Sequence, residues 1–286
     1  MGADRATVKR CVELQDAGRH EEALALLFPL IEQDPDEPRW WWCKARSLAA
    51  TNRVTAMLDA VRNALEDDKI AVEAEEADWL DPYRDLPHVV LAAGVDPTLN
   101  QAMELLTDND AEAALEALSM DGPYEGAARF LRGIALSELG RHDEAADEAG
   151  KVIELLPLCA DAWFNRGCAY EVTDRAEDAI AAYTKGAEVA PDHANCLFNL
   201  GLLLRRLARL PESEAAFARA TTADPHSPLL AYKRSEALAL VGRLQEAETE
   251  LARALKMDPA VRDAARESSI FPALLGEGFL DRIAKT

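Results

Sequence analysis

The chain contains five histidines and five cysteines, the residues that most often hold metal ions or act as nucleophiles, but their spacing supports neither role. There is no HExxH sequence and no CxxC pair, and no histidine neighbours a cysteine at a spacing typical of zinc ligands. An odd number of cysteines without a CxxC pair favours reduced thiols over a disulfide framework. We therefore expect no bound metal, and a cytoplasmic protein.

Motifs that bind nucleotides or activate a nucleophile are also missing. The sequence has no GxGxxG, no GxxxxGK[ST] and no GxSxG. Acidic pairs such as Asp67-Asp68 are typical of solvated charge, and Asp108-Asn109-Asp110 lacks the glycine and the closing glutamate of a calcium loop. The sequence therefore predicts no cofactor and no catalysis: the protein is not expected to be an enzyme.

The charge balance limits the class of partner. The 286 residues include 52 acidic and 31 basic side chains, a net charge of −21, which disfavours nucleic acid and anionic membranes as partners. Residues 51–200 carry 31 of the acidic and 11 of the basic side chains. This acidic region is either an ordinary solvated surface or a surface that attracts a basic partner. The sequence contains no run of eighteen apolar residues, the length typical of a membrane-spanning helix, and the first residues lack the apolar core of a secretion signal.

Several residue types recur every 34 positions, and the apolar residues between them follow the i, i+3, i+4, i+7 spacing of helices. The recurring prolines are Pro157, Pro191, Pro225 and Pro259, and the two columns of small residues are Gly133, Gly167, Gly201, Ser235 and Ala145, Ala179, Ser213, Ala247. The small residues permit close approach of two helices, and each proline ends the second helix of a unit. The turn inside each unit falls at Gly140, Asp174, Ala208 and Gly242, of which alanine is the least suited to a left-handed turn.

These units resemble tetratricopeptide repeats of the bacterial type. The unit that begins at Ala160 matches the family pattern at Trp163, Gly167, Tyr170, Ala179, Tyr183 and Pro191. The resemblance implies an all-α fold, in which helix-turn-helix repeats form a right-handed solenoid. The same register predicts four repeats at about residues 126–259.

The N-terminal region repeats the pattern in another register, because Gly18–Ala23 parallels Gly140–Ala145. The helical period fades at about residues 66–96, and a similar stretch follows the last repeat. We therefore predict two stacks: residues 1–92, with two repeats and a cap, and residues 93–286, with a degenerate helix pair, four repeats and a cap. The alternative is one continuous superhelix with an insertion.

Three consecutive tryptophans, Trp40, Trp41 and Trp42, point in directions about 100° apart on a helix, so one face cannot bury all three. Trp41 aligns with the tryptophan of the repeat pattern and is predicted to be core. Trp40 or Trp42 is then expected near the surface, against a partner or against the cap around Trp79.

A column of aromatic residues occupies one position of the first helix in each repeat, with amide or other side chains directly after it. The resemblance implies that these positions line the concave groove that binds peptides or helices. The candidate groove residues are Phe130, Phe164, Asn165, Phe198, Asn199, Tyr232, Lys233 and Trp42. The alternative is that the rings pack between adjacent first helices.

The resemblance implies a non-catalytic adaptor or scaffold that binds a protein or peptide. Of the five positions at which the family can clamp a chain-end carboxylate, only Asn199 and Lys233 match, so a more apolar ligand is expected. A basic segment is the other partner, which the acidic charge predicts. Two alternatives stay open: a chaperone for a secreted or membrane-inserting apolar segment, and a separate regulatory subunit of an enzyme. The sequence does not identify the partner or the oligomeric state.

Overall fold

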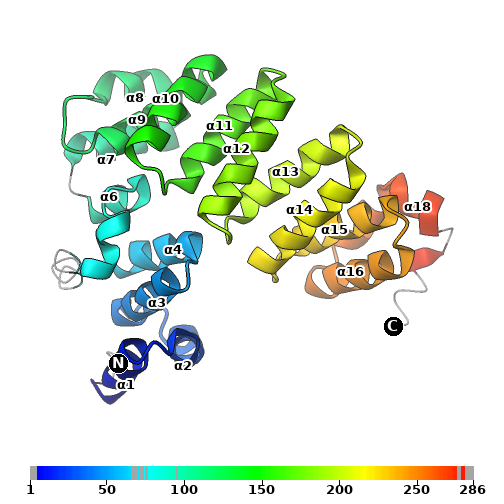
Figure 1. The fold of residues 1–286 in the computed structure, drawn as a ribbon, viewed down its shortest axis with the longest axis horizontal. Helices are drawn as coiled ribbons and strands as arrows, with labels where there is room; N and C mark the ends of the chain where they lie inside the picture. Colours follow the sequence, from blue (N-terminus) through cyan, green and yellow to red (C-terminus); the bar gives the residue numbers. More distant parts are fainter. Residues whose placement is uncertain are drawn as a thin grey trace. The chain divides into compact units, whose positions relative to one another are not determined.

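The computed structural model describes residues 5–65, 70, 74, 77–94, 96–275 and 278–280. These residues form helices and turns, with no β-strand among them (Figure 1). The N-terminal helices are α1 (Arg5–Asp16), α2 (His20–Gln33), α3 (Pro38–Ala50), α4 (Val54–Ala64), η1 (Asp78–Tyr83), α6 (Pro87–Ala93), α7 (Pro97–Thr107) and α8 (Ala111–Ala117). The next are α9 (Glu125–Glu138), α10 (His142–Leu155), α11 (Ala160–Val172), α12 (Ala176–Val189), α13 (Ala194–Arg206), α14 (Leu210–Ala223), α15 (Pro228–Leu240), α16 (Leu244–Met257), α17 (Val261–Glu267) and α18 (Ile270–Leu275).

The chain forms two compact units, which we describe separately. Unit 1 comprises residues 1–175 and 188–191, and unit 2 comprises residues 176–187 and 192–286. Within unit 1, α3 packs on α4 and α9 packs on α10, and within unit 2, α13 packs on α14 and α15 on α16. The predicted all-helical repeat fold is confirmed. The segment predicted as a degenerate helix pair contains α7 and α8. No described helix is long and apolar enough to cross a membrane.

The repeat boundaries lie where the prolines predict them. Helices α10, α12, α14 and α16 each end two residues before the proline of their repeat. A proline has no N–H to donate, and it disfavours helical geometry in the residue before it. One local sequence feature therefore sets the end of the second helix in each of these four repeats.

The turn inside each repeat contains one residue in the left-handed region. The φ angle is +73° at Gly140, +58° at Asp174, +58° at Ala208 and +81° at Gly242, as the sequence predicts. The residue after each of these is an arginine whose backbone N–H donates to a carbonyl five residues earlier, as Arg209 does to Leu204 at 2.9 Å. This bond closes the first helix and turns the chain back along it.

A small residue lets the two helices of a repeat approach closely. A Cβ atom built on Gly201 of α13 would lie 2.8 Å from the ring of Phe217 in α14. A Cβ atom on Gly133 of α9 would meet its nearest neighbour, the carbonyl oxygen of Ala145, at 3.7 Å. The first position therefore requires glycine, whereas the second has room for a methyl group.

The predicted burial of Trp41, with Trp40 or Trp42 near the surface, is wrong. Trp40 and Trp42 are buried, whereas Trp41 is partly exposed and donates its indole N–H to the carbonyl oxygen of Pro35 at 2.7 Å. Residues two apart on a helix point to nearly opposite sides. Because α3 packs on α1 and α2 on one side and on α4 and η1 on the other, both sides are buried. The expected contact with the cap is confirmed, since the Trp42 and Trp79 rings lie 4.8 Å apart.

The segment after α4 departs from the repeat. Within residues 77–94, which the structure describes, it contains a 3₁₀ helix, η1, and the seven-residue helix α6. The apolar core of unit 1 nevertheless continues across residue 92, because Leu80 and Val89 belong to the same buried cluster as Leu99 and Ala102. The division into stacks at residues 1–92 and 93–286 stays a prediction.

The left-handed alanine predicts a stabilising substitution. Replacing Ala208 with glycine should raise the free energy of unfolding by about 0.5–1 kcal/mol, because glycine adopts a positive φ without steric cost. Ala215, which is exposed on α14, provides the matched control: its replacement with glycine should lower stability by about 1 kcal/mol. Urea denaturation followed by circular dichroism measures both, and a loss of stability in Ala208→Gly would contradict the strain argument.

The space around Gly201 and Gly133 predicts opposite effects on stability when each is replaced with alanine. Gly201→Ala should destabilise the chain by about 1–3 kcal/mol, because the added methyl group displaces Phe217. Gly133→Ala should be neutral or stabilise it by up to about 1 kcal/mol, because alanine favours the helix. The same denaturation experiment decides the question, and equal effects at the two positions would show that the spacing of the helices adjusts freely.

Candidate functional site

The aromatic column divides into buried and partly exposed members. Trp42, Phe130 and Tyr232 are 9%, 8% and 7% exposed, which makes them part of the core. Phe164 and Phe198 are partly exposed. If the column formed one accessible groove floor, Tyr232 would also be accessible. The column therefore does not form one accessible groove floor, because Tyr232 is buried.

Short segments outside the repeats bury these three rings. In unit 1, Trp79 of η1 covers Trp42, and the imidazole of His88 in α6 lies 5.7 Å from the ring of Phe130. In unit 2, Phe271 of α18 lies 5.8 Å from the ring of Tyr232. Each buried member of the column thus has a ring from a neighbouring cap segment packed against it.

Tyr232 is held in place by polar contacts as well. Its hydroxyl donates to the carbonyl oxygen of Ala264 at 3.1 Å. Burial, together with the nearby carboxylate of Glu236, raises the pKa of Tyr232 to about 12. The phenol therefore stays neutral at physiological pH and serves as a packing residue.

Phe198 and Asn199 lie together on α13. The ring of Phe198 meets that of Phe217 edge to face, with centroids 6.0 Å apart. The amide of Asn199, which is partly exposed, donates to the hydroxyl of Tyr183 at 3.4 Å. In unit 1, Phe164 and Asn165 hold the equivalent positions on α11 and are also partly exposed.

Lys233 is engaged by a carboxylate that the sequence analysis missed. Its ammonium group donates to Glu236 at 2.9 Å, and Arg205 donates to the same carboxylate oxygen at 2.8 Å. Glu236 is only 5% exposed, and a buried carboxylate requires such partners. A signal was present in the sequence: the equivalent positions of the three preceding repeats hold apolar residues. These are Ile134, Cys168 and Leu202.

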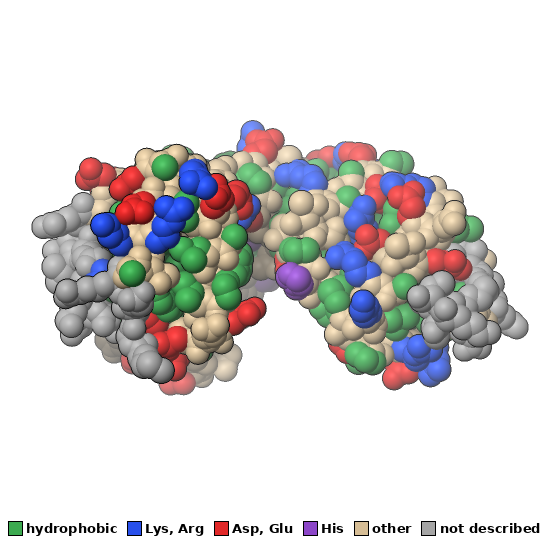
Figure 2. All heavy atoms as spheres, turned by 90° about the horizontal axis from the view of Figure 1, so that it is seen from below, with side chains coloured by type: hydrophobic (Ala, Val, Ile, Leu, Met, Phe, Trp, Pro, Cys, Tyr) green, Lys and Arg blue, Asp and Glu red, His purple; other side chains and the backbone are tan. Residues whose placement is uncertain are grey.

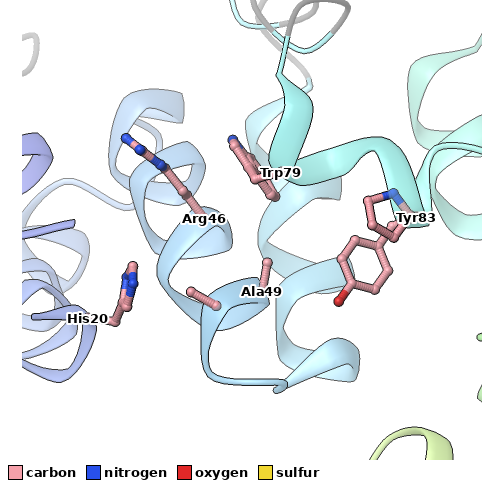
Figure 3. Close-up of a pocket in the computed structure, with 7 residues that line it drawn as sticks. His20, Arg46, Ala49, Trp79 and Tyr83 are labelled. Carbon is pink, nitrogen blue, oxygen red and sulfur yellow. The ribbon is translucent and has the colours of Figure 1, made fainter. Parts of the chain in front are cut away.

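A pocket lies between α3 and η1 (Figure 3). Arg46, Ala49 and Ala50 follow Trp42 at four, seven and eight positions, a spacing that places them along one helix face. The pocket has a volume of about 310 Å³. Its lining residues are His20, Arg46, Ala49, Ala50, Trp79, Pro82 and Tyr83.

The pocket combines aromatic walls with one cationic side chain. Trp79 and Tyr83 extend from η1 toward α3, and burial raises the pKa of the Tyr83 phenol (Figure 3). The guanidinium of Arg46 donates to Asp16 at 2.9 Å and to the side-chain oxygen of Gln15 at 3.5 Å. The sequence analysis did not predict this pocket, because its walls come from α2, α3 and η1 and share no period.

The remaining candidates for chemistry do not converge. Among the described residues, no group of three histidine, cysteine or acidic side chains could hold a metal ion. Within the part of the chain that is described, the buried Nδ1 atoms of His20 and His142 have no hydrogen-bond partner. Since the two histidines occupy equivalent turn positions, this feature belongs to the repeat and does not mark a site.

The burial of the column predicts different costs for two aromatic truncations. Tyr232→Ala should lower the free energy of unfolding by about 3–5 kcal/mol, because it removes a buried ring and leaves a cavity under Phe271. Phe198→Ala should cost about 1–2 kcal/mol, because part of that ring already contacts water. Chemical denaturation of each variant tests the order, and a larger loss for Phe198 would assign this ring to the core.

The comparisons with known proteins agree with this architecture. The sequence profile of the tetratricopeptide repeat matches residues 12–70, 99–154, 149–194 and 164–228. No curated protein matches the sequence.

Solved structures of MamA share the fold. A crystal structure of MamA has a TM-score of 0.50 and 19% identity, over 57% of this chain and 96% of that one. The MamA RS-1 ArsTM double mutant has the same TM-score and identity, over 58% and 97%. At this identity the likeness extends to the fold alone. The repeat profile, in contrast, covers more than half of the chain, which therefore belongs to the tetratricopeptide repeat family.

Proposed function

We propose that this chain is a non-catalytic scaffold that binds a protein segment on the first-helix face of its repeats. Membership of the tetratricopeptide repeat family supports a general role in protein–protein interaction. The observation that carries the proposal is the partial exposure of Phe198, at a position where Trp42, Phe130 and Tyr232 are buried by cap segments. A partly exposed aromatic ring beside an amide offers apolar contact area and a hydrogen-bonding group to a peptide.

The charge of unit 1 favours a basic partner. Unit 2 contains 15 of the 52 acidic and 14 of the 31 basic side chains, which leaves 37 and 17 in unit 1. Unit 1 thus has a net charge of −20 and unit 2 a net charge of −1. A field of this size raises the encounter rate of a positively charged segment. Figure 2 shows hydrophobic side chains exposed among the charged ones on one face of the molecule.

The cysteines support a reducing compartment such as the cytoplasm. None of the five forms a disulfide in the part of the chain that is described. A scaffold of this composition needs no oxidising environment to fold.

Phe198→Ala tests the binding face. With wild-type chain as bait, proteins captured from the native lysate are identified, and the affinity of the purified partner is then measured. Phe198→Ala should weaken that affinity by about 30-fold, the loss typical of an aromatic anchor. Leu244→Ala is the matched control, because Leu244 is 38% exposed on the second helix α16. An unchanged affinity in Phe198→Ala would reject this face as the binding site.

The salt dependence of the association rate tests the charge argument. The rate should fall as salt rises from 0.01 to 0.1 M, because the Debye length falls from roughly 30 Å to about 10 Å. A rate that stays constant over this range would exclude electrostatic attraction by unit 1.

A further inference from the structure

We propose that the pocket between α3 and η1 binds an aromatic side chain of a basic partner segment. The inference rests on the proposed function, because it specifies the chemistry of a segment bound to the first-helix face. It concerns unit 1 alone, and it depends on the shape of the pocket, on ring contacts within the chain and on the surrounding charge.

The shape of the pocket fits a flat ring. Its floor consists of Ala49 and Ala50, whose small side chains leave the space above α3 open. The rings of Trp79 and Tyr83 form its walls (Figure 3). An apolar cavity of roughly 150 Å³ is enough to bind benzene. A pocket of about 310 Å³ therefore accommodates the ring of phenylalanine, tyrosine or tryptophan.

The chain itself places rings against this helix face. Trp79 packs on Trp42 at 4.8 Å, one helical turn from Arg46, and Phe271 packs on Tyr232 at the equivalent position in unit 2. In both cases a segment outside the repeats inserts an aromatic ring. The pocket continues the same face of α3 toward its C-terminal end, so an aromatic ring from a partner would meet similar surroundings there.

The single cationic group of the pocket also suits a ring. Arg46 is already bonded to Asp16, which lies on α1, so its charge is compensated within the chain. A compensated guanidinium is a weak attractor for a ligand carboxylate, but its planar face can still stack on an aromatic ring. The pocket therefore favours an aromatic group over an anionic one.

The surroundings of the pocket favour a basic segment. Exposed aspartates lie near the residues that line it: Asp16 bonds to Arg46, and Asp78, Asp81 and Asp85 lie in and beside η1. Arg84 pairs with Asp81 at 2.6 Å, and Arg46 pairs with Asp16. Asp78 and Asp85 contribute to the net charge of unit 1, which is −20 in total. Lysine or arginine residues that flank the aromatic anchor would therefore be attracted.

Short peptides test the inference with the full-length chain. The probes are acetyl-Lys-Gly-Phe-Gly-Lys-amide, the same peptide with Leu in place of Phe, and the same peptide with Glu in place of both Lys. We expect the Phe peptide to bind about fivefold more tightly than the Leu peptide in calorimetric titrations, and the Glu peptide to bind most weakly. Equal affinity for Phe and Leu would reject the aromatic anchor. If the Glu peptide binds as tightly as the Phe peptide, which carries two lysines, the preference for a basic segment is rejected.

A substitution that fills the pocket tests whether the peptide binds there. Ala50→Phe adds a ring to the floor of the pocket, and it should weaken binding of the Phe peptide by roughly tenfold. Ala181→Phe is the matched control, because Ala181 is exposed on α12, outside the pocket. If the partner captured from the lysate binds the Ala50→Phe variant normally but loses affinity for Phe198→Ala, the pocket inference fails and the proposed function holds. If both variants bind normally, both proposals fail.

Discussion

The packing of the two helices within each repeat is the constraint on which the rest of this structure depends. A single helix pair cannot bury its apolar faces alone, so each pair must pack tightly and then stack on its neighbours. At Gly201 the ring of Phe217 occupies the space that a side chain would need, and the hydroxyl of Ser213 donates to the carbonyl oxygen of Gly201 at 2.7 Å. Two small residues, one from each column, thus hold α13 and α14 together. The side of the first helix that faces away from the second helix remains outside this contact.

Features that depend on contacts within one repeat can be predicted from the sequence. The prolines predict the ends of the second helices, because their effect is local. The left-handed turn at Ala208 follows from its register with Gly140 and Gly242, although alanine does not favour that conformation. In such cases the repeat determines the backbone, and the individual residue adapts to it.

Features that depend on segments outside the period could not be predicted in the same way. Trp40 and Trp42 are both buried because α3 has neighbours on two sides, which a helical wheel of one segment does not show. The pocket over Ala49 exists because η1 lies against α3, and no periodic column contains Trp79 or Tyr83. Glu236 is an intermediate case: its departure from the apolar residues of the other repeats is visible in the sequence, but its partner Arg205 lies on another helix.

The aromatic column contains buried and partly exposed rings at equivalent positions of the repeats. Where a short segment adjoins the array, as at Trp42 and Tyr232, it packs a ring on the column and buries it. Helix α13 is flanked in the chain by repeat helices alone, and Phe198 on it stays partly exposed. The residue type is aromatic in all three places, so the neighbouring segment decides whether the ring is core or accessible. The ligand proposed above would use the same surface that these adjoining segments cover. The accessible part of the column is therefore restricted to the positions that these segments leave uncovered.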